Sequence, residues 1–167
     1  MSIAQTLFVA ALGLLVLALI AFTGVVVVSA RRVDGGAYLT WGLARRVVMS
    51  RADRGELNRW AFYAHRISGM AIFAFLALHI VDVSLYSFSR SLYDNVHYLY
   101  GTIPVRVLEC GLWFAILFHT LNGLRLLVID VADMGRDTAA RVLLGITAFT
   151  IAAGIAGSLM ILVPGLS

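Results

Sequence analysis

Four long apolar stretches constrain this chain more than any other feature of its sequence. They cover about residues 6–30, 65–88, 107–131 and 141–163. A helix needs about 20 mostly apolar residues to cross the hydrocarbon core of a bilayer. Only 13% of the 167 residues are charged, whereas about a quarter are charged in a soluble domain. The sequence therefore predicts an all-α integral membrane protein with four transmembrane helices and no room for a separate catalytic domain.

Three regions follow from the positions of these stretches. Residues 1–30 are expected to form an extra N-terminal transmembrane helix, because the apolar stretch is too long for a signal peptide and lacks a basic leader. Residues 31–64 form an arginine-rich connection, in which 41–48 mixes arginine with apolar residues and favours a short interfacial helix. Residues 65–167 are expected to form a three-helix anchor bundle. A tyrosine-rich loop between its first two helices is typical of a membrane interface.

The distribution of arginine predicts the orientation in the membrane. All 13 basic residues are arginines, and eight of them lie in residues 31–66. Such residues concentrate on the cytoplasmic side, so we expect 31–64 to face the cytoplasm of a cell inner membrane, with the N-terminus outside. The net charge of +4 does not indicate nucleic-acid binding, because the arginines flank the apolar spans. The single cysteine, Cys110, excludes a disulfide framework or a CxxC metal site.

His119 is the strongest candidate for a cofactor ligand. Ionisable residues inside spans are costly and are therefore functional candidates. Haem b requires an imidazole on its iron, apolar walls for its ring and cations near its propionates. His119 has apolar neighbours, Gly123 follows on the same helix face and leaves room for a flat ring, and Arg125 lies about 9 Å nearer the cytoplasm. Asp130 lies on the same stripe. The alternative is a structural histidine bonded to a neighbouring helix.

His79 is a candidate ligand for a second, distal haem. It lies about 20 Å from the cytoplasmic end of its span, past the midplane, whereas His119 lies slightly nearer the cytoplasm. Two depths allow one haem or two. The alternative for His79 is a structural hydrogen bond towards Asp82, one turn along the helix.

His65 and Arg66 lie at the cytoplasmic edge of the second span, where they could bind haem propionates or a quinone carbonyl. Ser68 and Gly69 would open a small polar pocket beside them. The alternative is ordinary snorkelling of charged side chains to the interface. In the fourth span, small residues four apart favour close helix packing: Gly145, Ala153, Gly154 and Gly157. The sequence contains no nucleophile–base arrangement, phosphate loop or zinc-ligand spacing.

Two motifs resemble the signatures of one family. His65-Arg66-Ile67-Ser68-Gly69 resembles the His-Arg-x-Ser/Thr-Gly signature of the cytochrome b membrane-anchor (C-type) subunit of succinate dehydrogenase. Residues 119–125, His-Thr-Leu-Asn-Gly-Leu-Arg, with Asp130 five residues later, resemble the second signature, His-x-x-x-Gly-x-Arg followed by Asp. The resemblance covers about residues 57–165, and its specificity comes from both motifs occurring in order at suitable membrane depths.

The resemblance implies a three-helix anchor of succinate:quinone oxidoreductase, respiratory complex II, that pairs with a second anchor subunit and holds haem b. It implies His119 as the proximal axial ligand, the other ligand on the partner anchor, and His65 with Arg66 near the propionates and the quinone. His79 matches the histidine that binds the distal haem in two-haem relatives. Succinate oxidation, FAD and the iron–sulfur clusters would belong to a flavoprotein and an iron–sulfur subunit.

The chain departs from this family in three ways, and other functions stay open. Phe62 replaces a serine that contacts quinone in some members, Leu126 replaces a residue that is often His or Phe, and the first span has no counterpart in the usual anchor. Alternatives are a quinol:fumarate reductase anchor, a haem b anchor of a hydrogenase or formate dehydrogenase, a haem-free anchor and half of a small transporter. Quinone type and oligomeric state are not determined by the sequence.

Overall fold

Four long helices make up most of the chain. The computed structural model describes residues 2–33, 54–132 and 135–163. The long helices are α1 (Ile3–Val33), α3 (Arg54–Phe88), α5 (Ile103–Ala132) and α6 (Arg136–Leu162). Each contains a stretch that is long and apolar enough to cross a membrane. The prediction of an all-α protein with four transmembrane helices is therefore confirmed.

Helix α3 begins earlier than the apolar pattern predicted. It starts at Arg54, eleven residues before His65, so residues 54–64 belong to the helix and not to the connection. These first turns contain polar and aromatic side chains, which lower the local hydropathy without preventing helix formation. Trp60 and Tyr63 pack edge to face, with ring centroids 5.9 Å apart, as expected of aromatic residues at an interface. The predicted interfacial helix at 41–48 lies outside the described residues.

The tyrosine-rich segment between the second and third spans is helical, so the expectation of a loop was wrong. Ser89 is extended, with φ −164° and ψ 119°, and ends α3. Helix α4 (Arg90–His97) and a 3₁₀ turn, η2 (Tyr98–Gly101), follow. Val96 is buried and belongs to the same apolar cluster as Phe8 of α1. Leu99 packs against this cluster. This packing against α1 stabilises helical turns that are too short and polar to be recognised from hydropathy.

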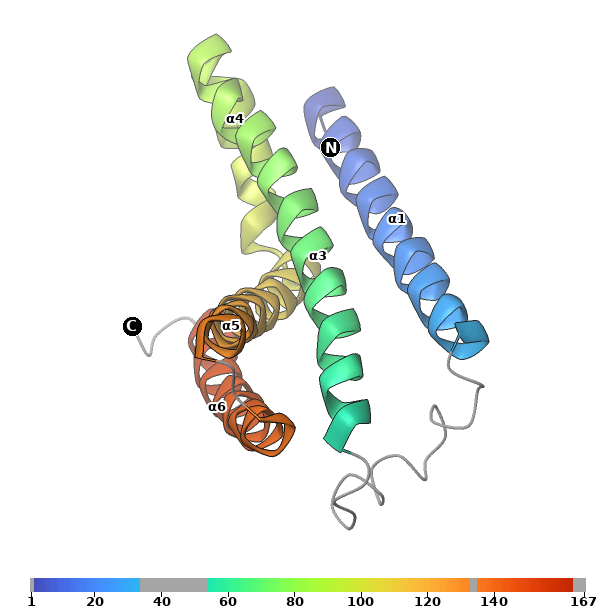
Figure 1. Cartoon of the computed structure of the whole chain (residues 1–167). Coiled ribbons are helices and arrows are strands. Elements are labelled where there is room, and N and C mark those ends of the chain that lie inside the picture. The colour runs from blue at the N-terminus through green and yellow to red at the C-terminus, as the bar shows by residue number, and fades with distance from the viewer. Residues whose placement is uncertain (1, 34–53, 133–134, 164–167) are drawn as a thin grey trace.

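The helices form a bundle in which α3 lies between α1 and the α5–α6 pair (Figure 1). The predicted role of small residues in α6 is confirmed at two positions. A Cβ on Gly154 would lie 2.1 Å from Phe114, and one on Gly157 would lie 2.1 Å from Trp113. Trp113 also donates a 3.1 Å hydrogen bond to the carbonyl of Ala153. Gly145 has no such role within the described part of the chain, where a Cβ on it would meet nothing within 4 Å.

Helix α1 is attached to the bundle near its amino end. Phe8 is buried against Leu78 and Val96. Gln5 donates a 2.9 Å hydrogen bond to the carbonyl of Asn95 in α4. Farther along α1, an almost wholly apolar cavity of about 240 Å³ separates it from α3 and α5. The amino end of α1 and helix α4 therefore lie at the same end of the bundle, as expected for spans that alternate in direction (Figure 1).

Candidate functional site

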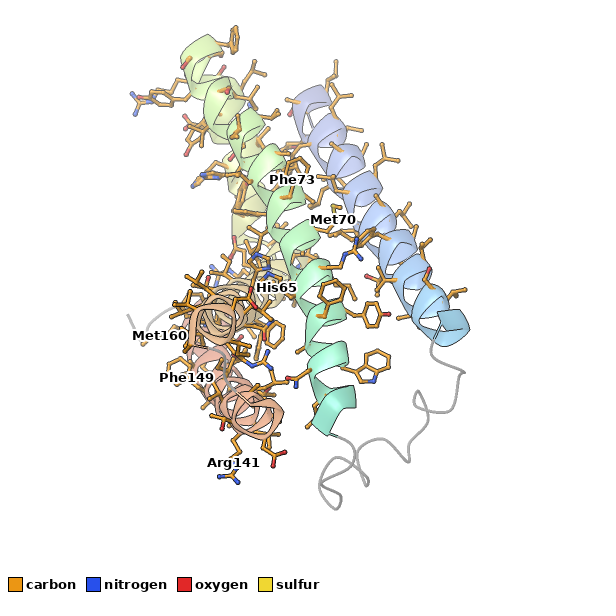
Figure 2. All side chains as sticks on the ribbon, in the orientation of Figure 1. His65, Met70, Phe73, Arg141, Phe149 and Met160 are labelled. Atoms are coloured by element: carbon orange, nitrogen blue, oxygen red, sulfur yellow. The ribbon has the colours of Figure 1, made fainter. Side chains whose placement is uncertain are left out.

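Two histidines from different spans stack where α3 meets α5. His65 of α3 and His119 of α5 have ring centroids 3.9 Å apart and planes only 6° from parallel. Figure 2 shows His65 on the side of α3 that faces α5 and α6. The two sequence motifs, far apart in the chain, are thus joined through their first residues.

The hydrogen bonds of His119 identify the nitrogen that remains available. Its Nδ1 lies 3.0 Å from the backbone carbonyl oxygen of His65 and 3.2 Å from the Ser68 hydroxyl. A carbonyl oxygen only accepts hydrogen bonds, so Nδ1 carries the ring proton in this arrangement. In a neutral imidazole, Nε2 then has a free lone pair. Nε2 is therefore the atom of His119 that could bind a metal.

Two glycines allow the rings to lie against the opposite helices. A Cβ on Gly69 would lie 2.7 Å from Cε1 of His119, and one on Gly123 would lie 3.2 Å from Cε1 of His65. Gly123 was expected to leave room for a flat ring beside His119. The structure places the imidazole of His65 at Gly123, and the glycine beside His119 is Gly69. Each motif thus supplies both a histidine and the glycine that the other histidine requires.

The pair retains hydrogen-bonding capacity that the described residues do not use. Nδ1 of His65 is buried and has no hydrogen-bond partner among them. Buried polar atoms nearly always have a partner, so such an atom indicates that a further group belongs there. The described residues contain no cluster of three His, Cys, Asp or Glu side chains that could hold a metal by themselves.

Arg125 lies inside the bundle and connects three helices. Its side chain is 4% exposed. Nε donates to the carbonyl of Ala139 in α6 at 3.0 Å, Nη1 to Oδ1 of Asn122 at 3.0 Å, and Nη2 to Oδ1 of Asn58 in α3. The sequence interpretation missed Asn58 and Asn122. A fully buried asparagine in a span is costly, which is a signal for Asn122, whereas nothing in the sequence marks Asn58.

Two other candidates lie outside the histidine pair. Arg66 is exposed, and its guanidinium carbon lies 5.5 Å from the ring centroid of Phe62. Asp130 is also exposed. Both charges thus lie on the surface of the described bundle, where a partner subunit or a ligand could reach them. Phe62, noted above as a departure from some relatives, is the residue that supports Arg66.

His79 lies apart from the pair, about 21 Å along α3 from His65. It is exposed and stacks on Phe75, with centroids 5.5 Å apart and planes 12° from parallel. Asp82 is buried near Tyr100, and its Oδ1 has no hydrogen-bond partner among the described residues. Among the described residues, the expected alternative of a bond between His79 and Asp82 is therefore not found, and the imidazole faces outward from the bundle.

Fold and site together define a class: an integral membrane protein of four spans with a histidine pair between two of them. Residues 51–156 match the family of succinate dehydrogenase/fumarate reductase transmembrane subunits. The chain belongs to this family, as the two motifs predicted, and α1 lies outside the matched region.

Two relatives resemble this chain over part of its length. The chain is 43% identical over 82 residues to the succinate dehydrogenase 2 membrane subunit SdhC of Mycobacterium tuberculosis. This alignment covers 49% of this chain and 60% of that protein. It is 34% identical over 73 residues to the succinate dehydrogenase hydrophobic membrane anchor subunit of Halobacterium salinarum, covering 43% and 56%. The match thus spans less than two thirds of either relative.

Proposed function

We propose that this chain is the cytochrome b anchor subunit of a succinate:quinone oxidoreductase, with haem b bound at His119 and a quinone site near Arg66. The observation that carries the proposal is the bonding of His119. Its Nδ1–H donates to the His65 carbonyl oxygen at 3.0 Å, so Nε2 is the ring nitrogen that can bind iron. A histidine that binds a metal typically donates its other ring N–H to such an acceptor.

The surroundings of His119 suit this cofactor. Leu117, Phe118 and Leu121 supply apolar surface next to it in the sequence. The unpartnered Nδ1 of His65 is suited to a propionate or a quinone carbonyl. Bound haem b would supply one-electron redox chemistry, whose potential the axial ligand and its hydrogen bonds help to set. The residues of this chain hold the ring, orient it and exclude water.

The outward position of His79 is suited to a ligand shared with another subunit. We infer a second membrane anchor on this side, and His79 as the ligand of a distal haem if two haems are bound. Phe75 stacks on the imidazole and limits its rotation. The same exposed face would otherwise be covered by lipid.

Arg66 is the residue of this chain that we assign to the quinone. Phe62 lies beneath its guanidinium group, which leaves the N–H donors free for a quinone carbonyl or for carboxylates of a partner. A soluble iron–sulfur subunit would deliver electrons at this end of the bundle, and FAD and succinate oxidation would lie in a flavoprotein subunit. The family includes fumarate reductases, and the names of both relatives favour the succinate-oxidising direction.

Sidedness follows from arginine content. We infer that the end of α3 nearest Arg54 faces the cytoplasm of a cell inner membrane, because residues 31–66 contain eight arginines. The N-terminus would then lie outside.

The test is the haem content of the purified complex. His119→Ala is expected to remove the proximal haem from the reduced-minus-oxidised spectrum and to lower the pyridine haemochrome count, while the subunits remain assembled. His97→Ala is the matched control, because His97 is exposed in α4, at the end of the bundle away from Arg54. An unchanged spectrum in the His119→Ala complex would refute the ligand assignment. A colourless wild-type complex would instead favour a haem-free anchor.

A further inference from the structure

The sequence places Ser68 in a pocket near the quinone, but the structure gives its hydroxyl another role. We propose that Ser68 is a positioning residue for His119, whose hydroxyl keeps the ring proton on Nδ1 and Nε2 directed to iron. This inference rests on the proposed function, because it concerns how the haem ligand is held.

The first argument is where the hydroxyl lies. Ser68 is 7% exposed, so a quinone or water has little access to it. Its Oγ donates to the carbonyl of His65 at 3.0 Å, and it lies 3.2 Å from Nδ1 of His119. The hydroxyl is therefore shared between the helix that carries it and the imidazole of the opposite helix.

The second argument is the direction of these hydrogen bonds. A hydroxyl has one proton to donate and two lone pairs that accept. Because the proton of Ser68 is directed to the His65 carbonyl, a lone pair of Oγ faces Nδ1 of His119. Nδ1 then faces two acceptors, this hydroxyl and the carbonyl at 3.0 Å. A protonated Nδ1 can share its single N–H between these two acceptors, whereas an unprotonated Nδ1 could donate to neither.

The opposite tautomer fits this environment poorly. With the proton on Nε2, the lone pair of Nδ1 would face the carbonyl oxygen of His65, and neither atom could donate. Only the Ser68 proton could then bond Nδ1, and this would break the bond from Ser68 to His65. The hydroxyl thus favours the tautomer that leaves Nε2 free to bind a metal.

A consequence follows for a bound cofactor. A hydrogen bond accepted from the other ring N–H raises the basicity of a histidine ligand and fixes its orientation, and loss of such a partner typically lowers metal affinity about 10- to 100-fold. A more basic ligand stabilises ferric over ferrous iron. Ser68 is therefore expected to lower the midpoint potential of the haem at His119 without contacting it.

The test compares substitutions at residue 68 in the purified, assembled complex. Ser68→Ala removes the hydroxyl. The threonine and valine side chains of Ser68→Thr and Ser68→Val have nearly the same shape. Threonine has a hydroxyl where valine has a methyl group, so comparing the two variants separates the effect of hydrogen bonding from that of packing. Ser84→Ala is the matched control, because Ser84 lies on the same helix and donates to the carbonyl of Ile80 at 2.6 Å but is exposed.

The readouts are the low-spin ferric EPR spectrum, the haem midpoint potential and the rate of haem loss to apomyoglobin. We expect Ser68→Ala and Ser68→Val to shift the EPR spectrum, raise the potential and weaken haem binding by about 10- to 100-fold. Ser68→Thr and Ser84→Ala should resemble the wild type. A wild-type spectrum and potential in Ser68→Val, or an equal change in Ser68→Thr, would overturn the proposal.

The outcomes separate this inference from the proposed function. If His119→Ala abolishes the haem signal but Ser68→Val leaves spectrum and potential unchanged, His119 is the ligand and only the role of Ser68 is wrong. If His119→Ala leaves the signal unchanged, the ligand assignment fails. A higher quinone KM in Ser68→Ala with unaltered haem spectra would show a quinone contact and overturn the positioning role.

Discussion

The imidazole rings of His65 and His119 lie face to face, with centroids 3.9 Å apart and planes within 6° of parallel. The pair joins α3 to α5, and each ring lies against a glycine of the opposite helix. The geometry of one histidine is therefore coupled to that of the other, and a change at either glycine should affect both.

Gly69→Ala should displace the ring of His119. The added Cβ would lie 2.7 Å from Cε1 of that ring, and overpacking of this kind costs about 1–3 kcal/mol. We expect a lower thermal stability in detergent and a reduced haem-to-protein ratio. Gly111→Ala is the matched control, because a Cβ there meets no atom of residues 2–33, 54–132 or 135–163 within 4 Å. Wild-type haem content and stability in Gly69→Ala would contradict the predicted contact.

Gly157→Ala should separate α5 from α6. The new methyl group would lie 2.1 Å from Nε1 of Trp113, whose hydrogen bond to the Ala153 carbonyl would then lengthen or break. Thermal unfolding should show a loss of about 1–3 kcal/mol. Gly145→Ala on the same helix has open space and should be neutral or slightly stabilising, since alanine is the better helix former. Equal stability of the two variants would be inconsistent with close packing at Gly157.

The spans could be predicted from the sequence because the cost of placing polar groups in lipid makes apolar composition a local signal. The start of α3 at Arg54 and the helical segment α4 could not be predicted in this way. Both contain polar residues, and both lie at the ends of spans, where hydropathy no longer separates helix from loop. Their structure depends on packing, such as that of Val96 in the apolar cluster that includes Phe8.

Four residues of the candidate site could be singled out from the sequence, but which histidine lies against which glycine could not. His65, Gly69, His119 and Gly123 were identified from their motifs, and Gly123 was assigned to the face of His119. Which glycine faces which histidine depends on how α3 crosses α5, and a single sequence does not show this. Asn58 was missed because its partner, Arg125, lies 67 positions away in the chain.

Tyr100 should make stability depend on pH in the alkaline range. Burial and then the neighbouring Asp82 carboxylate raise the pKa of the Tyr100 phenol above its ordinary value of 10.0. As pH rises above about 10, the unfolded chain releases this proton first, so the folded state loses stability with increasing pH. Below that range the contribution is fully present.

Tyr100→Phe should remove this part of the pH dependence. Chemical denaturation in detergent at about pH 9 and about pH 11 should show a smaller decrease in unfolding free energy for Tyr100→Phe than for the wild type. Tyr98→Phe is the control, because Tyr98 is 75% exposed in the same 3₁₀ turn. The same decrease in both variants would rule out a specific contribution of Tyr100.

Arg66→Ala should impair quinone reduction if the proposed quinone site is correct. The side chain is exposed beside Phe62, so its loss should leave the bundle intact. Loss of one charged hydrogen bond of about 1.5–3 kcal/mol corresponds to about a 10- to 100-fold lower kcat/KM for quinone. Succinate oxidation with an artificial soluble acceptor should be unchanged. Equal loss of both activities would count against a quinone role.

Arg125→Leu should destabilise the bundle more than the loss of any surface arginine. The guanidinium group is buried and donates to Ala139, Asn122 and Asn58 on three helices. Hydrogen bonds to charged groups contribute about 1.5–3 kcal/mol each, and leucine removes all three of them. We expect a loss of at least about 3 kcal/mol in detergent unfolding, whereas Arg141→Ala, at the exposed end of α6 (Figure 2), should stay within about 0.5 kcal/mol of wild type.

Arg125→Lys separates the charge of this residue from its geometry. A lysine keeps the positive charge but presents a point-like ammonium group in place of the planar fork that reaches several acceptors. We therefore expect Arg125→Lys to lose most of the stability lost in Arg125→Leu. A double-mutant cycle with Asn58→Ala should give a coupling energy of about 0.5–3 kcal/mol, as found for residues in one hydrogen-bond network. Full stability in Arg125→Lys would mean that charge alone, and not the bridging of α3, α5 and α6, explains why arginine occupies this position.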